Sequence, residues 1–415
     1  MNGLMNELQI GFTRGRRIED NIFMLRYVIE SCRREKKELI AVFVDFAKAF
    51  DSIRRGSLIE CMKRCKCDPK MIDVFARVYE NDSTEFSVNG ERMGRMDVWN
   101  GIRQGCTCSP QLFIMAVNEI IISLQRSGLG FRNDCVYVPA LFFADDGVIF
   151  GNSVREVERM IDVLVSKTAE IGMKVNKNKC NVLVFNRKMN VRSIKGMNVV
   201  KDVKYLGVRV SSTKDVFKLH REDVCMKGRK MTSMTYSVIH KSWNRVLIGK
   251  TYWKSVIMPS LLYGSSVFCW NLSDIGKLQR CENAVWRCVL GAPSYAPLVT
   301  LQGEVGYSSM KVRDMKGKLI YEKHVRNGEN ELLKRMYDDM CEWNKCKWIE
   351  TVKAYREKVG MQVSELDDMS KDCIKRKVYA WESDRWNEER MQKVTLGVYN
   401  ECKNEIKDEG LYEND

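Results

Sequence analysis

Apolar residues recur along this chain with two different periods, which predict strands in some segments and helices in others. Residues 39–46, LIAVFVDF, form an unbroken β-branched and aromatic run that ends in a carboxylate, as in a buried strand. Residues 140–151, ALFFADDGVIFG, are two apolar runs that meet at Ala-Asp-Asp-Gly, which predicts a hairpin with two carboxylates in its turn. We expect a second hairpin to turn at Asn89-Gly90, and further strands at 181–185 and 204–210.

Other segments have the spacing of helices. Residues 57–65 and 71–79 place apolar side chains three and four positions apart, which predicts two helices packed together. Residues 110–125 begin with proline and are apolar nearly all round, as in a buried helix. A capping box at Ser153 opens a further helix that ends near Gly172.

The order of these elements predicts an α+β fold, with an antiparallel sheet and helices on one face. Beyond about residue 215 the pattern becomes mainly helical, and residues 274–290 form an amphipathic helix that stops at Gly291. The last part of the chain, 331–415, is charged, rich in tryptophan and helical by pattern.

Charge changes this picture more than composition does. The net charge is +15, and residues 174–254 alone hold 20 Lys and Arg against 4 Asp and Glu. Basic stretches of this density usually neutralise phosphates, so we favour nucleic-acid contact over a merely solvated face. Without a signal segment or a long apolar run, the protein is expected to be soluble and intracellular, with no membrane contact. Its 16 cysteines are interpreted as reduced thiols, and their spacing predicts no zinc site.

Three carboxylates suggest a specific chemistry. Asp145 and Asp146 are adjacent in an apolar hairpin, where burying unpaired carboxylates would cost several kcal/mol by order of magnitude. Asp45 stands at the end of another apolar strand. Together they could hold two Mg²⁺ ions roughly 3.5–4 Å apart, the arrangement used for in-line phosphoryl transfer. An Asp-Asp pair alone is weak evidence, because such pairs are common in exposed loops.

Five segments resemble, in order, the palm motifs of reverse transcriptases: FVDFAKAFDSI (43–53), GIRQGCTCSP (101–110), FFADDGVIF (142–150), GMKVNKNKC (172–180) and KYLGV (204–208). The opening LQIGFTRGRRIEDN (8–21) resembles the finger motif of the non-LTR, LINE-type retrotransposon enzymes. Residues 257–270 and 278–293 resemble their thumb and post-thumb region. The resemblance covers about residues 8–310, and the order of its motifs makes it specific.

This resemblance implies roles for individual residues of the site. Asp45, Asp145 and Asp146 match the metal-binding carboxylates, and the backbone carbonyl of Phe46 is a further candidate ligand. Phe50 matches the aromatic side chain that excludes a 2′-hydroxyl and so selects deoxynucleotides, a role compatible with simple core packing.

The remaining matches surround the nucleotide. Gln104 and Gly105 match the loop against which the incoming nucleotide and the template base pack, and Lys179 matches the lysine near the leaving pyrophosphate. Three arginines lie where the finger motif offers cations to the triphosphate, and all three remain candidates: Arg14, Arg16 and Arg17. Asp51 is interpreted as a cap of the following helix rather than as a metal ligand.

The resemblance also implies a division of the chain into domains. We predict partial fingers, a palm, a helical thumb with a post-thumb region, and a charged helical C-terminal region, at residues 1–38, 39–212, 213–330 and 331–415. With no upstream endonuclease segment and no CCHC knuckle, the chain is expected to be a truncated or domesticated polymerase core.

The implied function is RNA-directed DNA polymerisation, in which a primer 3′-hydroxyl is extended with dNTPs by two Mg²⁺ ions, with Mn²⁺ as a substitute. The expected partners are an RNA template and a DNA primer, while protein partners stay open. The nucleus is the expected location and the cytoplasm the alternative. The alternative function is a catalytically inactive fragment that only binds nucleic acid. A structural protein with a chance Asp-Asp turn would explain neither the ordered motifs nor the basic segment.

Overall fold

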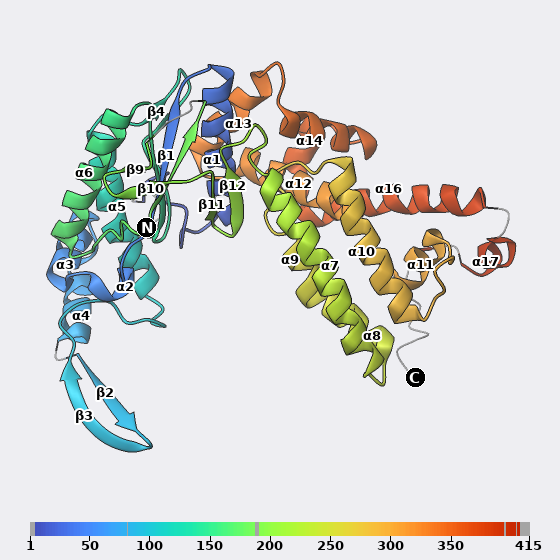
Figure 1. Ribbon diagram of the computed structural model, residues 1–415, viewed down its shortest axis with the longest axis horizontal. Coiled ribbons are helices and arrows are strands. Elements are labelled where there is room, and N and C mark those ends of the chain that lie inside the picture. Colours follow the sequence, from blue (N-terminus) through green and yellow to red (C-terminus); the bar gives the residue numbers. More distant parts are fainter. Residues whose placement is uncertain (1–4, 81, 187–190, 394–395, 404, 407–415) are drawn as a thin grey trace. The chain divides into compact units, whose positions relative to one another are not determined.

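The structure is a computed structural model, and it describes residues 5–80, 82–186, 191–393, 396–403 and 405–406. The chain folds into two compact units (Figure 1). The first contains Met1–Val216 and Glu329–Asp339, and the second contains Phe217–Gly328 and Met340–Asp415. The first unit is an α+β fold and the second is built from helices.

A sheet of six strands forms the centre of the first unit, in the order β6-β7-β1-β8-β10-β9. β1 (Leu39–Val44) lies in the middle, and its Val42 pairs with Ile149 of β7 and with Val182 of β8. All six side chains of β1 are buried, which explains why the strand is apolar at every position instead of alternating. The described pairs are antiparallel except for β8 with β10. The other strands are β6 (Ala140–Phe143), β7 (Asp146–Gly151), β8 (Asn181–Phe185), β9 (Ser193–Ile194) and β10 (Met197–Val199).

The two segments that carry the carboxylates form the predicted elements. The strand that begins at Leu39 ends at Val44, so Asp45 is the first residue beyond it. β6 and β7 form the predicted hairpin, closed by the two-residue loop Ala144-Asp145. Ala144 has a φ of 55°, a left-handed conformation that is uncommon for residues other than glycine.

Besides the sheet, the first unit contains helices α1 to α6. Of these, α5 and α6 pack against each other. α5 has an apolar surface nearly all round because most of it is buried. Tyr205, from outside the sheet, packs edge-on against Phe43 of β1. The helices are α1 (Ile18–Arg34), α2 (Ala49–Ser52), α3 (Arg55–Arg64), α4 (Pro69–Tyr79), α5 (Ser109–Arg126) and α6 (Val154–Ile171).

The ends of α6 largely follow the sequence prediction. The Ser153 hydroxyl accepts a hydrogen bond from the Glu156 N–H at 3.2 Å, and the helix ends at Gly172 with a φ of 92°. The Glu156 carboxylate does not complete the predicted capping box. It accepts hydrogen bonds from the backbone N–H groups of Gly130 and Asn152, so it ties a neighbouring loop to the helix instead.

The predicted single strand at 204–210 is wrong. These residues form a hairpin of β11 (Asp202–Tyr205) and β12 (Val208–Ser211). Leu206 and Gly207 make the turn, with φ values of 48° and 79°. Gly207 is a residue typical of such turns, but leucine is unusual at the first turn position, so the sequence did not indicate a turn here. The remaining hairpins are β2 (Ser83–Val88) with β3 (Glu91–Asp97), which turns at Asn89-Gly90 as predicted, and β4 (Phe131–Arg132) with β5 (Tyr137–Val138).

The second unit has a core of large apolar side chains, among them Trp253, Leu278 and Trp286. α10 ends at Gly291, as predicted, and this glycine has the left-handed conformation common at helix ends. No helix in the described part of the chain is long and apolar enough to cross a membrane. The helices are α7 (Lys218–His240), α8 (Arg245–Tyr252), the π-helical turn η2 (Trp253–Ile257), α9 (Met258–Leu261), α10 (Leu272–Leu290), α11 (Leu298–Val305), α12 (Met310–Asn327), α14 (Lys347–Lys358), α15 (Val363–Asp368), α16 (Lys371–Met391) and α17 (Gly397–Cys402).

Part of α13 (Glu331–Glu342) belongs to the first unit. The Asn330 side chain donates a hydrogen bond to the Glu7 carbonyl at 3.2 Å, and the Tyr27 hydroxyl donates to the Asp339 carboxylate. The described residues after 330 are mainly helical, as predicted, but the first of them pack with the sheet unit.

Candidate active site

The sheet register brings the three candidate carboxylates to one end of the sheet. Val44 of β1 pairs with Gly147 of β7. In an antiparallel pair the next positions are Asp45 and Asp146, which therefore face each other just beyond the last paired residues. Asp145 occupies the adjacent turn. Residues about 100 positions apart in the sequence are thus gathered by strand pairing alone.

The site is more open than its apolar surroundings suggested. Asp45 is half-buried, whereas Asp145 and Asp146 are exposed, so the expectation that the hairpin buries both turn carboxylates is wrong. The strands on either side are buried and the turn projects from them.

Electrostatic repulsion nevertheless marks the site. Although Asp146 is exposed at the surface, neighbouring protein atoms displace part of the water around its carboxyl group. This desolvation, followed by the charges of Asp145 and Asp45, raises the pKa of Asp146 to about 6. Within the described residues, none of the three carboxylates forms an ion pair with a lysine or arginine. The protein itself leaves this negative charge uncompensated, which is the condition that a bound cation relieves.

The donor chemistry fits Mg²⁺, although these residues do not enclose an ion by themselves. Across the described ranges, no three Asp, Glu, His or Cys side chains converge closely enough to hold one metal ion. Mg²⁺ is usually held by only one or two protein carboxylates, with substrate phosphates and water completing its shell. Asp45 with Asp146, and the adjacent Asp145, can supply that number.

Phe46 and Lys179 lie beside the end of β1. The Asn176 N–H donates to the Asp45 carbonyl at 2.8 Å, and the Ala47 N–H donates to the Lys174 carbonyl at 2.8 Å. These two backbone hydrogen bonds fix the residues immediately before and after Phe46. Lys179 follows in the same turn, where its side chain is exposed. Metal binding by the Phe46 carbonyl and proton donation by Lys179 stay predictions.

Cys180 is a contact that sequence reasoning missed. Its thiol lies 3.3 Å from the Asp45 N–H, as an acceptor, and is itself buried. A buried cysteine next to a motif lysine gives no sequence signal of this role.

The finger motif supports the Asp145-Asp146 turn through Gln9, which sequence reasoning also missed. The Gln9 side chain is fully buried, and its Oε1 atom accepts hydrogen bonds from the N–H groups of Gly11 at 3.2 Å and Ala144 at 3.3 Å. The backbone of Ile10 donates to Phe142 at 2.8 Å. A Cβ added at Gly11 would lie 2.5 Å from the Ala144 nitrogen, so only glycine allows this approach. A glutamine between two apolar residues was the available signal.

Of the three candidate arginines, Arg16 is already occupied. Its guanidinium donates to the Asn6 carbonyl at 2.6 Å and to the Gln9 carbonyl, and burial lowers its pKa. Arg17 precedes α1 and is half-buried, while Arg14 is exposed. Neither of these two side chains donates a hydrogen bond or forms an ion pair within the described residues. The structure leaves Arg14 and Arg17 free to meet an anion.

Phe50 lies on α2, which begins four residues after Asp45. Its ring stacks on Phe113 of α5, with centroids 4.3 Å apart and planes 7° from parallel. The side chain is half-buried, so one face packs in the protein while part of the ring stays accessible. This geometry is compatible with both core packing and sugar selection.

Asp51 does not cap a helix. α2 begins after Lys48 and α3 begins after Arg54, so Asp51 lies inside the first turn of α2. Its carboxylate instead accepts a hydrogen bond from the Gln104 side chain at 3.0 Å. The cap prediction failed because α2 starts three residues before the position that the motif spacing suggested.

Gln104 and Gly105 occupy an exposed loop. Gly105 has a φ of 86°, and a Cβ there would meet no protein atom within 4 Å. Backbone conformation, rather than crowding by the protein, therefore explains the glycine.

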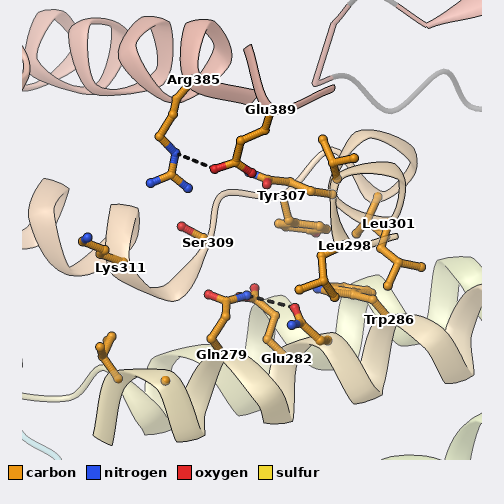
Figure 2. Close-up of a pocket in the computed structure, with 16 residues that line it drawn as sticks. Gln279, Glu282, Trp286, Leu298, Leu301, Tyr307, Ser309, Lys311, Arg385 and Glu389 are labelled. Atoms are coloured by element: carbon orange, nitrogen blue, oxygen red, sulfur yellow. Dashed lines mark hydrogen bonds and ion pairs between the residues drawn. The ribbon is translucent and has the colours of Figure 1, made fainter. Parts of the chain in front are cut away.

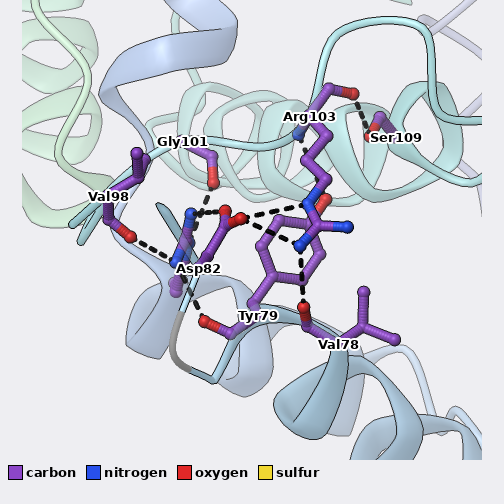
Figure 3. Close-up of polar contacts among 8 residues, drawn as sticks. Val78, Tyr79, Asp82, Val98, Gly101, Arg103 and Ser109 are labelled. Atoms are coloured by element: carbon purple, nitrogen blue, oxygen red, sulfur yellow. Dashed lines mark hydrogen bonds and ion pairs between the residues drawn. The ribbon is translucent and has the colours of Figure 1, made fainter. Parts of the chain in front are cut away.

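Two arginines and one carboxylate brace this loop (Figure 3). Asp82 accepts from Arg55 at 2.6 Å and from Arg103 at 2.8 Å, through different carboxylate oxygens. Burial alone would raise the pKa of Asp82, but hydrogen bonds and charges from these arginines lower it. Both guanidinium groups also lie over the Tyr79 ring, 4.7 and 5.5 Å from its centre.

Arg55 also binds the backbone on both sides of the β2–β3 hairpin, which leads into the loop of Gln104 and Gly105. It donates to the carbonyls of Tyr79, Val98 and Gly101 at 3.0, 2.6 and 3.1 Å. Arg103, the residue next to Gln104, donates to the Val78 carbonyl of α4 and is linked through Asp82 to Arg55 of α3. Arg55, Tyr79 and Asp82 lie outside the quoted motif segments, and no local pattern in the sequence links them to Arg103.

The sheet carries three carboxylates at one end, and the braced loop of Gln104 and Gly105 lies between Asp45 and Asp145 in the sequence. This arrangement is that of the palm of a nucleic-acid polymerase. The family model described as reverse transcriptase (RNA-dependent DNA polymerase) matches residues 1–210 of the 415, and the chain belongs to that family.

Curated relatives come from retrotransposons, which confirms the resemblance to non-LTR elements. The chain is 26% identical over 275 residues to the Pol polyprotein of the type-1 retrotransposable element R2 of Bradysia coprophila, covering 60% of this chain and 31% of the relative. It is 26% identical over 182 residues to an R2 Pol polyprotein of Nasonia vitripennis, covering 44% and 18%. It is 25% identical over 172 residues to a transposon TX1 protein of Xenopus laevis, covering 41% and 13%. The chain thus spans about a third or less of these relatives.

Among solved structures, the chain is similar to telomerases. Telomerase of Candida albicans, solved with a fragment of telomeric RNA, aligns with a TM-score of 0.43 and 9% identity over 84% of this chain and 53% of that chain. Apo telomerase of Candida tropicalis aligns with a TM-score of 0.42 and 14% identity over 88% and 57%.

Proposed function

We propose that this chain is an RNA-directed DNA polymerase that extends a primer 3′-hydroxyl with dNTPs on an RNA template. The observation that carries the proposal is the register of β1 and β7, which sets Asp45 opposite Asp146 beside Asp145. The uncompensated charge there, expressed in the raised pKa of Asp146, supports binding of two Mg²⁺ ions, with Mn²⁺ as a substitute.

Asp45, Asp145 and Asp146 would hold the ions, with the Phe46 carbonyl as a further ligand. When bound, such ions activate the attacking hydroxyl and stabilise the leaving pyrophosphate. The protein's own contribution is to keep the carboxylates in register through strand pairing and through the Gln9 contact to the turn.

The side chains around the carboxylates would bind and select the nucleotide. Phe50, fixed by its stack on Phe113, would fill the space of a 2′-hydroxyl and exclude ribonucleotides. Gln104 and Gly105 would pack against the nucleotide and the template base, while Arg14 and Arg17 would meet the triphosphate. Lys179, exposed beside β1, would donate a proton to the leaving pyrophosphate.

The exposed basic residues of α7, notably Lys227, Arg229 and Lys230, suit binding of the template-primer backbone. Because the family acts on nucleic acid, we also propose that the protein resides in the nucleus.

Primer extension on an RNA template tests the function. The assay would compare the wild type with Asp145→Asn and with Asp134→Asn, a matched change in the exposed loop between β4 and β5. Loss of metal binding should lower the rate of extension on the order of 100-fold or more, since several kcal/mol of transition-state stabilisation are lost. Asp134→Asn should keep wild-type activity. Template-primer binding without extension above the level of Asp145→Asn would instead support an inactive nucleic-acid binder.

A further inference from the structure

A concave site lies wholly within the helical unit, between α10, α11, the start of α12 and α16 (Figure 2). Its volume is about 270 Å³, close to the lower end of the range of about 300–1,000 Å³ for small-ligand pockets. None of the candidate catalytic or nucleotide-binding residues lines it. We call it the thumb cavity.

One wall of the thumb cavity is flat and apolar. Trp286 and Tyr307 stack with ring centroids 5.2 Å apart and planes 11° from parallel. Leu298 and Leu301 lie on the same side in Figure 2. Trp286 belongs to the core of the unit, so this wall is held rigidly. Trp286 is only 4% exposed, so a planar ligand would meet mainly the half-buried Tyr307 ring and the exposed Leu298 side chain, which are held in place at little cost in side-chain entropy.

The floor carries a buried carboxyl group with unused hydrogen-bonding capacity. Glu282 is only 2% exposed, and its Oε2 atom accepts from the Gln279 amide at 2.8 Å. Its Oε1 atom has no hydrogen-bond partner in the described structure, and Arg313 approaches it only to 3.9 Å. Burial raises the pKa of Glu282 to about 7, so the group can donate as well as accept near neutral pH. Buried polar atoms without partners are rare, which points to a ligand that supplies one.

Cations gather on the opposite side of the cavity. Lys311 and Arg385 both line it, and Arg385 lies 3.4 Å from Glu389. Burial, followed by the charges of Lys358 and Arg385, lowers the pKa of Lys311. Lys311 forms no ion pair in the described part of the chain. An anion bound here would relieve the repulsion between these like charges.

We propose that the thumb cavity binds a single nucleotide. Its base would lie against the Trp286–Tyr307 wall, with a polar edge at Glu282, and its phosphate would pair with Lys311 and Arg385. A planar body, a hydrogen-bonding edge and an anionic group match these three surfaces together. The volume admits one nucleotide and excludes a duplex. Either a free mononucleotide or an unstacked nucleotide of a single strand has this chemistry.

The proposal goes beyond polymerase activity and does not require it, so it can be tested in the full chain carrying Asp145→Asn. Calorimetric titration would use AMP, the oligonucleotide rA5 and inorganic phosphate as probes. Lys311→Gln and Arg385→Gln would each remove one cation, and Lys345→Gln would serve as a matched exposed control on the same unit. Circular dichroism would confirm that each variant is folded.

We expect AMP to bind at least tenfold more tightly than phosphate, because the base contributes. Lys311→Gln or Arg385→Gln should weaken AMP binding about tenfold or more, as for loss of a charge-assisted hydrogen bond, and Lys345→Gln should not. If rA5 shows this pattern and AMP does not bind, the nucleotide comes from a strand. A photo-crosslink from 8-azido-AMP, or from an rA5 bearing one 8-azidoadenosine, should fall on the peptides of Trp286 or Tyr307.

Three results would overturn the proposal: no binding of either nucleotide probe, phosphate binding as tight as AMP binding, or crosslinks confined to the sheet unit. Because the polymerase carboxylate is already disabled, none of these results bears on primer extension by the wild type.

Discussion

The raised pKa of Asp146 makes it possible to measure how much folding stability the protein loses at the candidate metal site. Its folded-state pKa of about 6 lies above the ordinary value of 3.8, so ionisation destabilises the folded protein. The destabilisation is fully present above pH 6 and absent below about pH 4. An ionised carboxylate held in this way lowers the stability of the folded protein, but it is also suited to bind a cation.

We therefore predict that Asp146→Asn raises the thermal midpoint above that of the wild type at pH 7.5 in EDTA. The difference should shrink as the pH falls toward 4, because the wild-type carboxyl is then protonated in the folded protein and no longer carries the charge that destabilises it. Mg²⁺ should raise the midpoint of the wild type more than that of the variant. Thermal scans over this pH range check the prediction, and a difference independent of pH would contradict it.

Gly11 allows the second residue-level test, since it touches the turn without any chemistry of its own. Gly11→Ala places a methyl group against the Ala144 nitrogen, so the turn must shift or the fold must strain, at a cost of about 1–3 kcal/mol. We expect lower stability and a lower rate of primer extension. Gly56→Ala is the control, because a Cβ there meets nothing within 4 Å. Equal effects of the two changes would show that Gly11 does not position the turn.

At the scale of elements, the network around Asp82 joins α3, the end of α4 and the loop of Gln104 and Gly105. The Arg55 and Asp82 side chains are 14% and 10% exposed, so the pair is shielded enough for its loss to be felt. Because the pKa of Asp82 is lowered, its stabilisation is present above about pH 4 and is lost as the pH falls through the folded-state value.

A double-mutant cycle with Arg55→Gln and Asp82→Asn should give a coupling energy of about 0.5–3 kcal/mol in urea unfolding. The same variants should raise the KM for dNTPs more than they lower kcat, since the loop carries Gln104. Additive effects on stability, together with unchanged KM, would mean that the network does not brace the nucleotide loop.

The sequence predicted those elements whose structure depends on neighbouring residues in the chain. The strand ending at Asp45, the Asp145-Asp146 hairpin and the Asn89-Gly90 turn are encoded in contiguous residues, and all three formed as expected. The β11–β12 turn was missed because Leu206 adopts a left-handed conformation that its side chain disfavours.

The contacts that hold the candidate site are long-range, and here sequence reasoning fell short. Gln9 meets Ala144, and Asp51 meets Gln104, each across more than 50 residues. Such partners are set by the tertiary fold rather than by spacing. Burial was misjudged for the same reason, because a turn can project from two buried strands.

At the scale of the whole molecule, charge is distributed unevenly, and only part of the basic segment is free. Arg221 pairs with Asp274 inside the helical unit and Lys250 is buried, so neither can meet a phosphate. Lys227, Arg229 and Lys230 are exposed on α7. Residues 187–190, which hold two more basic side chains, lie outside the described residues.

Replacing these three α7 residues by glutamine should weaken template-primer binding and lower its salt dependence. Each lost phosphate contact removes about 0.7–0.9 from the slope of log K against log salt, so we expect a decrease of about 2–3. Changing three exposed lysines of the same unit, Lys345, Lys347 and Lys353, alters the net charge equally and should leave the slope unchanged. Fluorescence anisotropy at several salt concentrations measures both. If both sets of changes lowered the slope equally, the salt dependence would come from the net charge of the protein and not from phosphate contacts by α7.

The central claim is that Asp45, Asp145 and Asp146 act as one metal-dependent centre, and single-nucleotide incorporation on an RNA template tests it most directly. Asn substitutions at each position, and at Asp145 and Asp146 together, would be compared at saturating Mg²⁺. Each single change should lower the rate on the order of 100-fold or more, and the double change should lower it little further, because residues that act as a unit are not additive. Wild-type rates in any single variant, or losses that multiply in the double variant, would contradict the claim.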